Sequence, residues 1–166
     1  MFNISDNISK DKDEMYEQIL EYANMLMDGE SDYIANLANI SALLAQVLEN
    51  INWVGFYIVR SGQLVLGPFQ GKAACIRIDK GKGVCGTAFE TMKTQLVADV
   101  HAFPGHIACD SQSRSEIVVP ILYNNSVTAV LDIDSPILNR FDETDRLHLE
   151  ILCDIISKGC LWQNIN

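Results

Sequence analysis

Two pairs of strand-forming segments, each joined by a short turn, constrain the fold of this chain more than any other feature. Residues 53–60 and 63–69 are rich in β-branched and aromatic side chains, and a Ser-Gly dipeptide typical of tight hairpin turns separates them. Residues 116–122 and 127–134 have the same character and flank the polar segment Tyr-Asn-Asn-Ser. These two hairpins predict a central antiparallel sheet.

Helical periodicity precedes and follows the predicted hairpins. Apolar side chains recur every three or four residues over 16–27, 34–48 and 142–161. Asp32 stands where the second of these helices should be capped. The remaining predicted elements are shorter: a helix over 83–92 and strands over 74–78 and 95–98.

The length and composition are those of one compact domain. A chain of 166 residues with 48% hydrophobic residues can bury a substantial core without disulfides or a structural metal. We expect a flexible tail over residues 1–10 and one α+β domain over 11–166. In that domain the helices should pack mainly on one face of the sheet.

The charge pattern argues against several classes of partner. A formal net charge of −10 disfavours nucleic acid, which requires clustered Lys and Arg. No apolar segment approaches the roughly 18 residues that span a bilayer, and the first residues lack the basic start and apolar stretch of a secretory signal. We therefore expect a cytoplasmic protein that binds neither nucleic acid nor membrane. The sequence leaves a homodimer open.

A long segment without apolar periodicity runs from Asp99 to Ser115. Connections of this length are uncommon in compact domains and are often functional. A disordered surface excursion is the alternative, but Phe103, Ile107 and Cys109 are poorly suited to exposure in water. We therefore predict an ordered lid over a pocket.

The five cysteines fall into two groups. Cys75, Cys85 and Cys109 lie near glycines or prolines, where turns and helix starts can expose and stabilise a thiolate. Cys153 and Cys160 share the apolar arc of the C-terminal helical pattern, where a thiol acts as a small hydrophobic side chain. An odd cysteine count in a reducing compartment argues against a static disulfide framework, so the first group is expected to have catalytic, redox-sensing or metal-binding roles.

Two carboxylates end an otherwise apolar strand. Asp132 and Asp134 alternate with Leu131 and Ile133, so both acids are predicted to share one face of the strand. A solvated strand end is the ordinary interpretation of such a pattern. Under a lid, clustered carboxylates would instead raise one another's pKa, and an entering ammonium group would relieve their repulsion.

Four segments of the chain carry a resemblance to a known family. They read GPFQGKAACIRI, GKGVCGTAF, DVHAFPGHIACDSQSRSEIVVPI and AVLDIDSP, the last followed by FDETD. In order and local sequence they are similar to the free methionine-(R)-sulfoxide reductases, single GAF domains that repair oxidised free methionine. The resemblance covers roughly residues 53–156 and implies a GAF-like fold with a lid over the pocket.

The resemblance implies roles for individual residues. Cys109 matches the nucleophile that attacks the sulfoxide sulfur and becomes a sulfenic acid, and Cys75 matches the cysteine that resolves it as a disulfide. Cys85 matches a third redox participant, and whether Cys75 or Cys85 resolves first stays open. A thioredoxin-type reductant would restore the thiols without a metal or organic cofactor. The matching substrate-site residues are Glu116, Asp132, Asp134, Trp53 and Tyr57.

The implied activity is reduction of free L-methionine-(R)-sulfoxide to L-methionine, a repair reaction after oxidative stress. Ammonium capture by the acids would also select the free amino acid, because the α-nitrogen within a peptide is an uncharged amide. One alternative is a ligand sensor without turnover, since GAF domains often serve that role. Another is a zinc or iron site built from His101, His106, Cys109 and a second cysteine, although the spacing of the three ligands in the loop matches no strong metal signature.

Overall fold

A six-stranded antiparallel sheet forms the centre of the molecule in the computed structural model, which describes residues 8–105 and 111–162. The strands lie in the order β3-β2-β1-β6-β5-β4. Both predicted hairpins are present, as β1–β2 and β5–β6, and they meet in the middle of the sheet through the β1–β6 pair. The strand bounds are β1 Trp53–Arg60, β2 Gln63–Gly71, β3 Arg77–Asp79, β4 Gln95–Val97, β5 Ser115–Tyr123 and β6 Ser126–Ser135.

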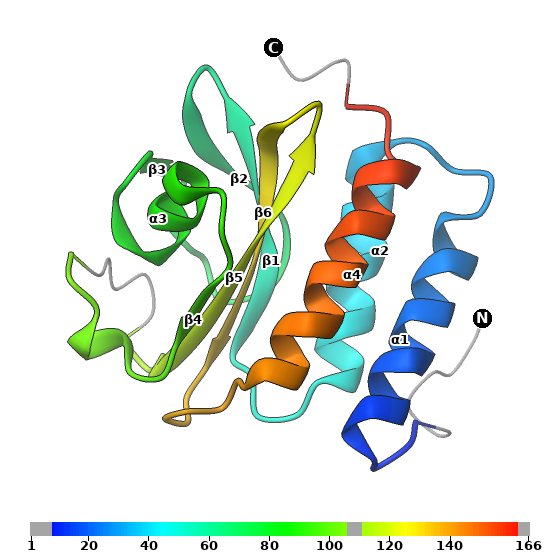
Figure 1. Cartoon of the computed structure of the whole chain (residues 1–166), viewed down its shortest axis with the longest axis horizontal. Helices are drawn as coiled ribbons and strands as arrows, with labels where there is room; N and C mark the ends of the chain where they lie inside the picture. Colours follow the sequence, from blue (N-terminus) through cyan, green and yellow to red (C-terminus); the bar gives the residue numbers. More distant parts are fainter. Residues whose placement is uncertain (1–7, 106–110, 163–166) are drawn as a thin grey trace.

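The helices are divided unequally between the two faces of the sheet (Figure 1). Helices α2 Tyr33–Val47 and α4 Glu143–Gly159 pack on one face, and α1 Lys12–Met27 packs on these two helices, so that the three helices form a layer on that side. The short helix α3, Gly83–Thr91, lies on the other face beside β3 and β4. This arrangement confirms the predicted α+β fold. None of the helices in the described residues is long and apolar enough to cross a membrane.

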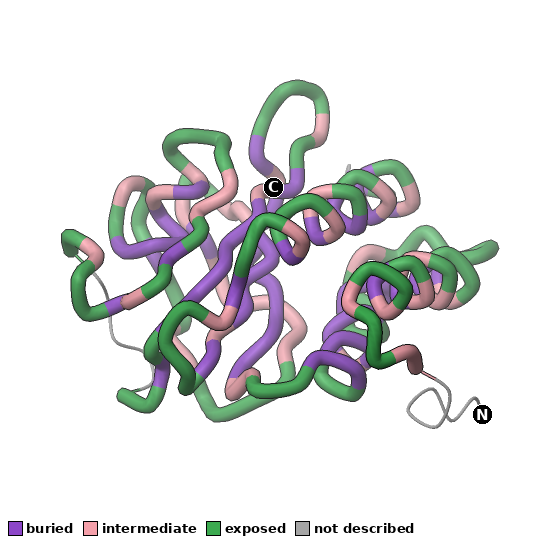
Figure 2. Tube along the Cα trace, turned by 60° about the horizontal axis from the view of Figure 1, so that its bottom comes forward, coloured by how far each residue is buried: buried purple, intermediate pink, exposed green. Residues whose placement is uncertain are grey.

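Strand alternation builds two separate apolar cores, so that the sheet is buried from both sides (Figure 2). On β1, Val54 and Phe56 face the three-helix layer, whereas Trp53 and Tyr57 face α3. The same alternation on β6 sends Leu131 into the three-helix core. The second core is smaller and contains the polar site.

Helices α2 and α4 begin where the sequence indicated, whereas α1 begins four residues earlier, at Lys12. Asp32 caps α2, and its carboxylate accepts a hydrogen bond from the backbone N–H of Ala35 at 2.9 Å. Asp142 caps α4 in a capping box with Asp145. The buried Asp145 carboxylate also accepts from Lys12 Nζ at 2.6 Å, which ties α1 to the start of α4.

In three segments the structure departs from the sequence expectation or describes only part of the segment. Residues 74–76 were expected in a strand but form a loop, and pairing with β2 begins only at Arg77. The long 99–115 segment includes a short 3-10 helix, Val100–Ala102, while positions 106–110 lie outside the described residues. Of the expected tail, residues 1–7 also lie outside them, and Ile8 packs against the three-helix core.

Candidate functional site

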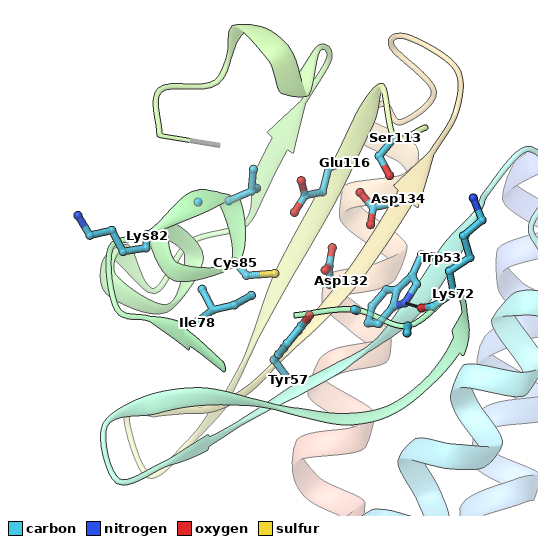
Figure 3. A pocket seen from close by; sticks show the side chains of 14 residues that line it. Trp53, Tyr57, Lys72, Ile78, Lys82, Cys85, Ser113, Glu116, Asp132 and Asp134 are labelled. Carbon is cyan, nitrogen blue, oxygen red and sulfur yellow. Dashed lines mark hydrogen bonds between the residues drawn. The ribbon is translucent and has the colours of Figure 1, made fainter. Parts of the chain in front are cut away.

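A pocket lies on the α3 face of the sheet, between β1, β5, β6, α3 and the loop after β2 (Figure 3). Its walls combine aromatic, acidic and sulfur-bearing side chains with two lysines near the mouth. The lining residues used below are Trp53, Tyr57, Lys72, Lys82, Cys85, Ser113, Glu116, Asp132 and Asp134.

Three carboxylates line one wall of this pocket. Asp132 and Asp134 project from the same face of β6, as the alternation predicted, and Glu116 stands opposite Asp134 on β5. Glu116 and Asp132 are only 6% and 7% exposed. Acids this deeply buried require either a proton or a positively charged partner.

Glu116 and Asp132 lie close enough for one carboxyl group to donate a proton to the other in a hydrogen bond. Burial raises the pKa of Glu116 well above its ordinary value, and the neighbouring Asp132 and Asp134 raise it further. Burial also raises the pKa of Asp132 to about 6, against the opposing effect of its hydrogen bonds to Cys85 and Glu116. Within the described residues, Asp132 Oδ1 has no hydrogen-bond partner. The wall is therefore poised to receive a cation.

Cys85 lies in the first turn of α3, as expected, with its sulfur directed at Asp132 (Figure 3). The helix N-terminus was expected to favour its thiolate slightly. The thiol is nevertheless 4% exposed, and burial raises its pKa, with Asp132 and Glu116 acting in the same direction. Desolvation and negative neighbours outweigh the helix dipole here, so Cys85 is a neutral thiol that hydrogen-bonds to Asp132.

Cys75 occupies the loop between β2 and β3 at the edge of the site. It is half-buried and disulfide-bonded, whereas Cys85, Cys153 and Cys160 are free. The Tyr57 hydroxyl donates a hydrogen bond to the Cys75 carbonyl at 3.0 Å and fixes the loop against β1. Cys109 lies outside the described residues.

The two cysteines of the C-terminal segment lie in the three-helix core, as predicted. Cys153 and Cys160 are 3% and 6% exposed. Burial raises the pKa of each thiol. Neither residue lines the pocket on the α3 face.

The predicted aromatic pair lies on the pocket side of β1. Trp53 and Tyr57 have ring centroids 5.9 Å apart, and Trp53 also stacks on Phe69 at 5.2 Å. Trp53 Nε1–H donates to the Lys72 carbonyl at 3.0 Å, which fixes the indole as a rigid wall. Both aromatic rings are buried, and their placement beside the acids agrees with the sequence expectation.

A glycine that the sequence analysis did not single out shapes this aromatic wall. A Cβ at Gly55 would stand 2.3 Å from Phe69 Cβ and 2.7 Å from the Trp53 ring. Only glycine allows Phe69 to close over Trp53 at this point. The signal available in the sequence was a glycine inside a strand, which often marks a close approach.

The sequence analysis also did not identify three polar residues that line the pocket, Ser113, Lys72 and Lys82. Ser113 is 3% exposed, and its hydroxyl accepts a hydrogen bond from Asn52 Nδ2 at 3.0 Å. Lys72 and Lys82 line the pocket from opposite sides. Because these residues come from separate loops and a helix start, only the tertiary structure brings them together.

One side-chain set could hold a metal ion. Cys85, Glu116 and Asp132 each offer a ligand atom, and these atoms lie within 4.8 Å of one another. The same set suits an ammonium group, which needs only oxygen acceptors. Of the metal ligands considered from the sequence, His101 is exposed, and His106 and Cys109 lie outside the described residues.

Comparison with known proteins places this chain in a family. The GAF domain sequence family matches residues 34–158. The free methionine-R-sulfoxide reductase of Escherichia coli is 50% identical over 147 residues, covering 89% of this chain and 89% of that protein. The chain belongs to the free methionine-(R)-sulfoxide reductase family of GAF domains.

Other members of the free methionine-(R)-sulfoxide reductase family agree with this assignment. The Saccharomyces cerevisiae reductase is 45% identical, covering 97% of this chain and 93% of that protein. The structure of the Neisseria meningitidis enzyme in complex with its substrate superimposes with a TM-score of 0.89 at 47% identity, covering 92% of this chain and 93% of that one. The family resemblance inferred from the four sequence segments is therefore confirmed.

Proposed function

We propose that this protein reduces free L-methionine-(R)-sulfoxide to L-methionine. The observation that carries the proposal is the wall of buried carboxylates in a chain half identical to a named free methionine-R-sulfoxide reductase. Uncompensated buried acids are costly, and the substrate ammonium group would neutralise them. The same requirement favours the free amino acid over protein-bound methionine sulfoxide, whose α-nitrogen is neutral.

The pocket suggests how the substrate is oriented. The ammonium group would bind the unpartnered Asp132 Oδ1 together with Asp134, and the S-methyl group would rest against Trp53. Glu116, whose pKa is raised by burial and by the neighbouring Asp132 and Asp134, would donate its proton to the sulfoxide oxygen. This assignment divides ammonium binding and proton donation among three acids that the sequence alone could not distinguish.

The proposed chemistry is carried by cysteines. The Cys109 thiolate attacks the sulfoxide sulfur, methionine leaves, and the oxygen stays on Cys109 as a sulfenic acid. The Cys75 thiol then displaces that oxygen as water and forms a disulfide, which a thioredoxin-type dithiol reduces with two electrons and two protons. The disulfide state of Cys75, beside three free described cysteines, supports this pairing.

Cys85 has a more restricted role in the proposal. Its neutral, buried thiol is a poor nucleophile as long as the carboxylates beside it are unneutralised. Binding of an ammonium group would remove part of that negative charge and make the thiolate more accessible. We therefore assign first resolution to Cys75 and keep Cys85 as a later redox participant. A reducing compartment such as the cytoplasm is required for the cycle.

The decisive experiment supplies racemic free methionine sulfoxide to the reduced protein with a thioredoxin system. We expect loss of the R epimer only, with an equal amount of methionine formed, measured by chiral chromatography. Methionine sulfoxide within a short blocked peptide is the matched control and should remain unchanged. Absence of methionine even with dithiothreitol would reject the proposed activity and favour a ligand-sensing domain.

Replacing Glu116 by glutamine should lower kcat/KM by on the order of 10²-fold, because the amide keeps the shape of the side chain but cannot transfer a proton. Most of the loss should fall on kcat, since Asp132 and Asp134 remain to bind the ammonium group. Because burial and the neighbouring acids raise the pKa of Glu116, the proton that it donates is lost as pH rises through that pKa, and wild-type activity should fall with it. The variant should lack this decline.

Rates between pH 5 and 9 would test the Glu116 assignment. Glu90→Gln, a substitution at an exposed position on α3, serves as the control and should leave both kcat and kcat/KM unchanged. An unaltered kcat/KM in Glu116→Gln would remove Glu116 from the mechanism.

A further inference from the structure

Ile76 presents an unusual surface beside the redox-active loop. Its side chain is 71% exposed, more than any other large hydrophobic residue in the described part of the chain. It directly follows Cys75, which is disulfide-bonded. An isolated exposed apolar residue is common. One that lies next to a disulfide that another protein would reduce can serve as a contact for that protein.

The backbone of this segment is fixed. The Ile76 carbonyl accepts a hydrogen bond from the backbone N–H of Leu66 at 2.9 Å, and the Cys75 carbonyl accepts one from the Tyr57 hydroxyl at 3.0 Å. Both anchors lie on strands of the central sheet. Ile76 is thus held outward by a rigid frame, so a partner would meet a preorganised apolar contact.

The charge around Ile76 differs in sign from that of the whole chain. Residues 72–82 contain four of the twelve Lys and Arg side chains and a single carboxylate, Asp79, whereas the chain as a whole carries a net charge of −10. Lys72 and Arg77 lie at the two ends of the exposed loop, and both are exposed. A basic surface of this kind attracts an acidic partner and repels a copy of itself.

We propose that residues 72–77 form the docking surface for a protein dithiol reductant, one whose reactive cysteine is surrounded by apolar surface with acidic residues at its rim. The proposal rests on the proposed function for the origin of the disulfide. In the step that it serves, the reductant thiolate attacks Cys75 Sγ, and the partner sulfur of Cys75 leaves as a thiolate. The second reductant thiol then displaces Cys75 from the mixed disulfide, so that two electrons and two protons pass to this protein.

A second copy of the chain fits this surface less well than a reductant does. In a twofold dimer the same patch meets itself, which would bring the basic segments of both copies together and would cover Cys75. A twofold contact here would therefore oppose both the charge pattern and access to the disulfide. An acidic reductant complements the basic charge of this surface and brings its own thiol to the Cys75 disulfide.

The test measures disulfide reduction directly and does not require the sulfoxide. Oxidised protein is mixed with reduced thioredoxin under pseudo-first-order conditions, quenched by alkylation, and the free Cys75 thiol is quantified by mass spectrometry. Ile76→Ser should slow reduction by roughly tenfold, the effect of losing one central apolar contact. Reduction by dithiothreitol should be unchanged, because a small dithiol needs no docking surface.

Two further comparisons sharpen this test. Leu147→Ser removes a side chain that is 56% exposed on α4, within the three-helix layer on the opposite face of the sheet, and should leave the thioredoxin rate unchanged. Raising the ionic strength should slow the wild-type reaction with thioredoxin but not with dithiothreitol, and Arg77→Glu should weaken this salt dependence.

Several outcomes would overturn the docking proposal. An unchanged thioredoxin rate in Ile76→Ser would place docking elsewhere, and equal slowing with both reductants would assign Ile76 to the reactivity of the disulfide itself. Failure of the proposed function has a different signature, since the wild-type protein would then form no methionine although thioredoxin still reduced its disulfide in an Ile76-dependent manner.

Discussion

Cys109→Ser should abolish methionine formation, with the single-turnover rate falling by on the order of 10⁴-fold or more, the scale typical of removing a catalytic nucleophile. A serine hydroxyl is almost fully protonated at neutral pH, and its oxygen cannot take part in the sulfenic acid and disulfide steps. Substrate binding should persist, because the acids and the indole that we assign to binding lie on β1, β5 and β6.

Two measurements separate chemistry from binding in this variant. Rapid-quench single turnover reports methionine formation, and the fluorescence of Trp53, which lines the pocket, reports substrate binding. The matched control is Cys160→Ser in the three-helix core, where Asn36 Nδ2 lies 3.6 Å from the sulfur and can donate to a hydroxyl instead. Normal methionine yield in Cys109→Ser would require another cysteine as nucleophile.

The sheet was predictable because its strands carry strong local signals. The turns between the paired segments fixed the two hairpins, and the alternation of Asp132 and Asp134 with Leu131 and Ile133 correctly placed the acids opposite the three-helix core. These inferences depend only on the two-residue periodicity of a strand. They needed no knowledge of what the acids face across the pocket.

Short apolar segments were less predictable. The Ala-Ala-Cys-Ile sequence before Arg77 has the composition of a buried strand, yet Ile76 is exposed and the residues before it form a loop. Four residues are too few for periodicity to separate a strand from a surface loop. Gly67 lies inside β2, where its missing side chain leaves room for Ile58.

The electrostatic character of the site could not be predicted from local sequence. The helix start was expected to favour the Cys85 thiolate only slightly, and the fold brings this thiol against Glu116 and Asp132 from two separate strands. Burial and these acids raise the pKa of the thiol instead. A protonation state depends on neighbouring groups that can be distant in the sequence and meet only through tertiary packing. Local sequence therefore does not predict it.

Cys75→Ala should permit one round of chemistry and then stop. We expect one methionine per protein molecule in a single turnover, because the proposed attack by Cys109 does not involve Cys75. Steady-state turnover with thioredoxin should fall by about 10²-fold or more, since the sulfenic acid is then left without the thiol that converts it to a disulfide. Dithiothreitol should restore part of the turnover by attacking the sulfenic acid directly.

The matched variant Cys85→Ala tests which thiol resolves first. Cys75 is half-buried in a loop at the pocket edge, whereas Cys85 is 4% exposed and burial beside two acids raises its pKa. Thioredoxin-driven turnover should therefore survive Cys85→Ala far better than Cys75→Ala, as measured by NADPH consumption in a coupled assay. The opposite order would transfer the resolving role to Cys85, and it would imply that bound ammonium neutralises the neighbouring carboxylates enough to release the Cys85 proton.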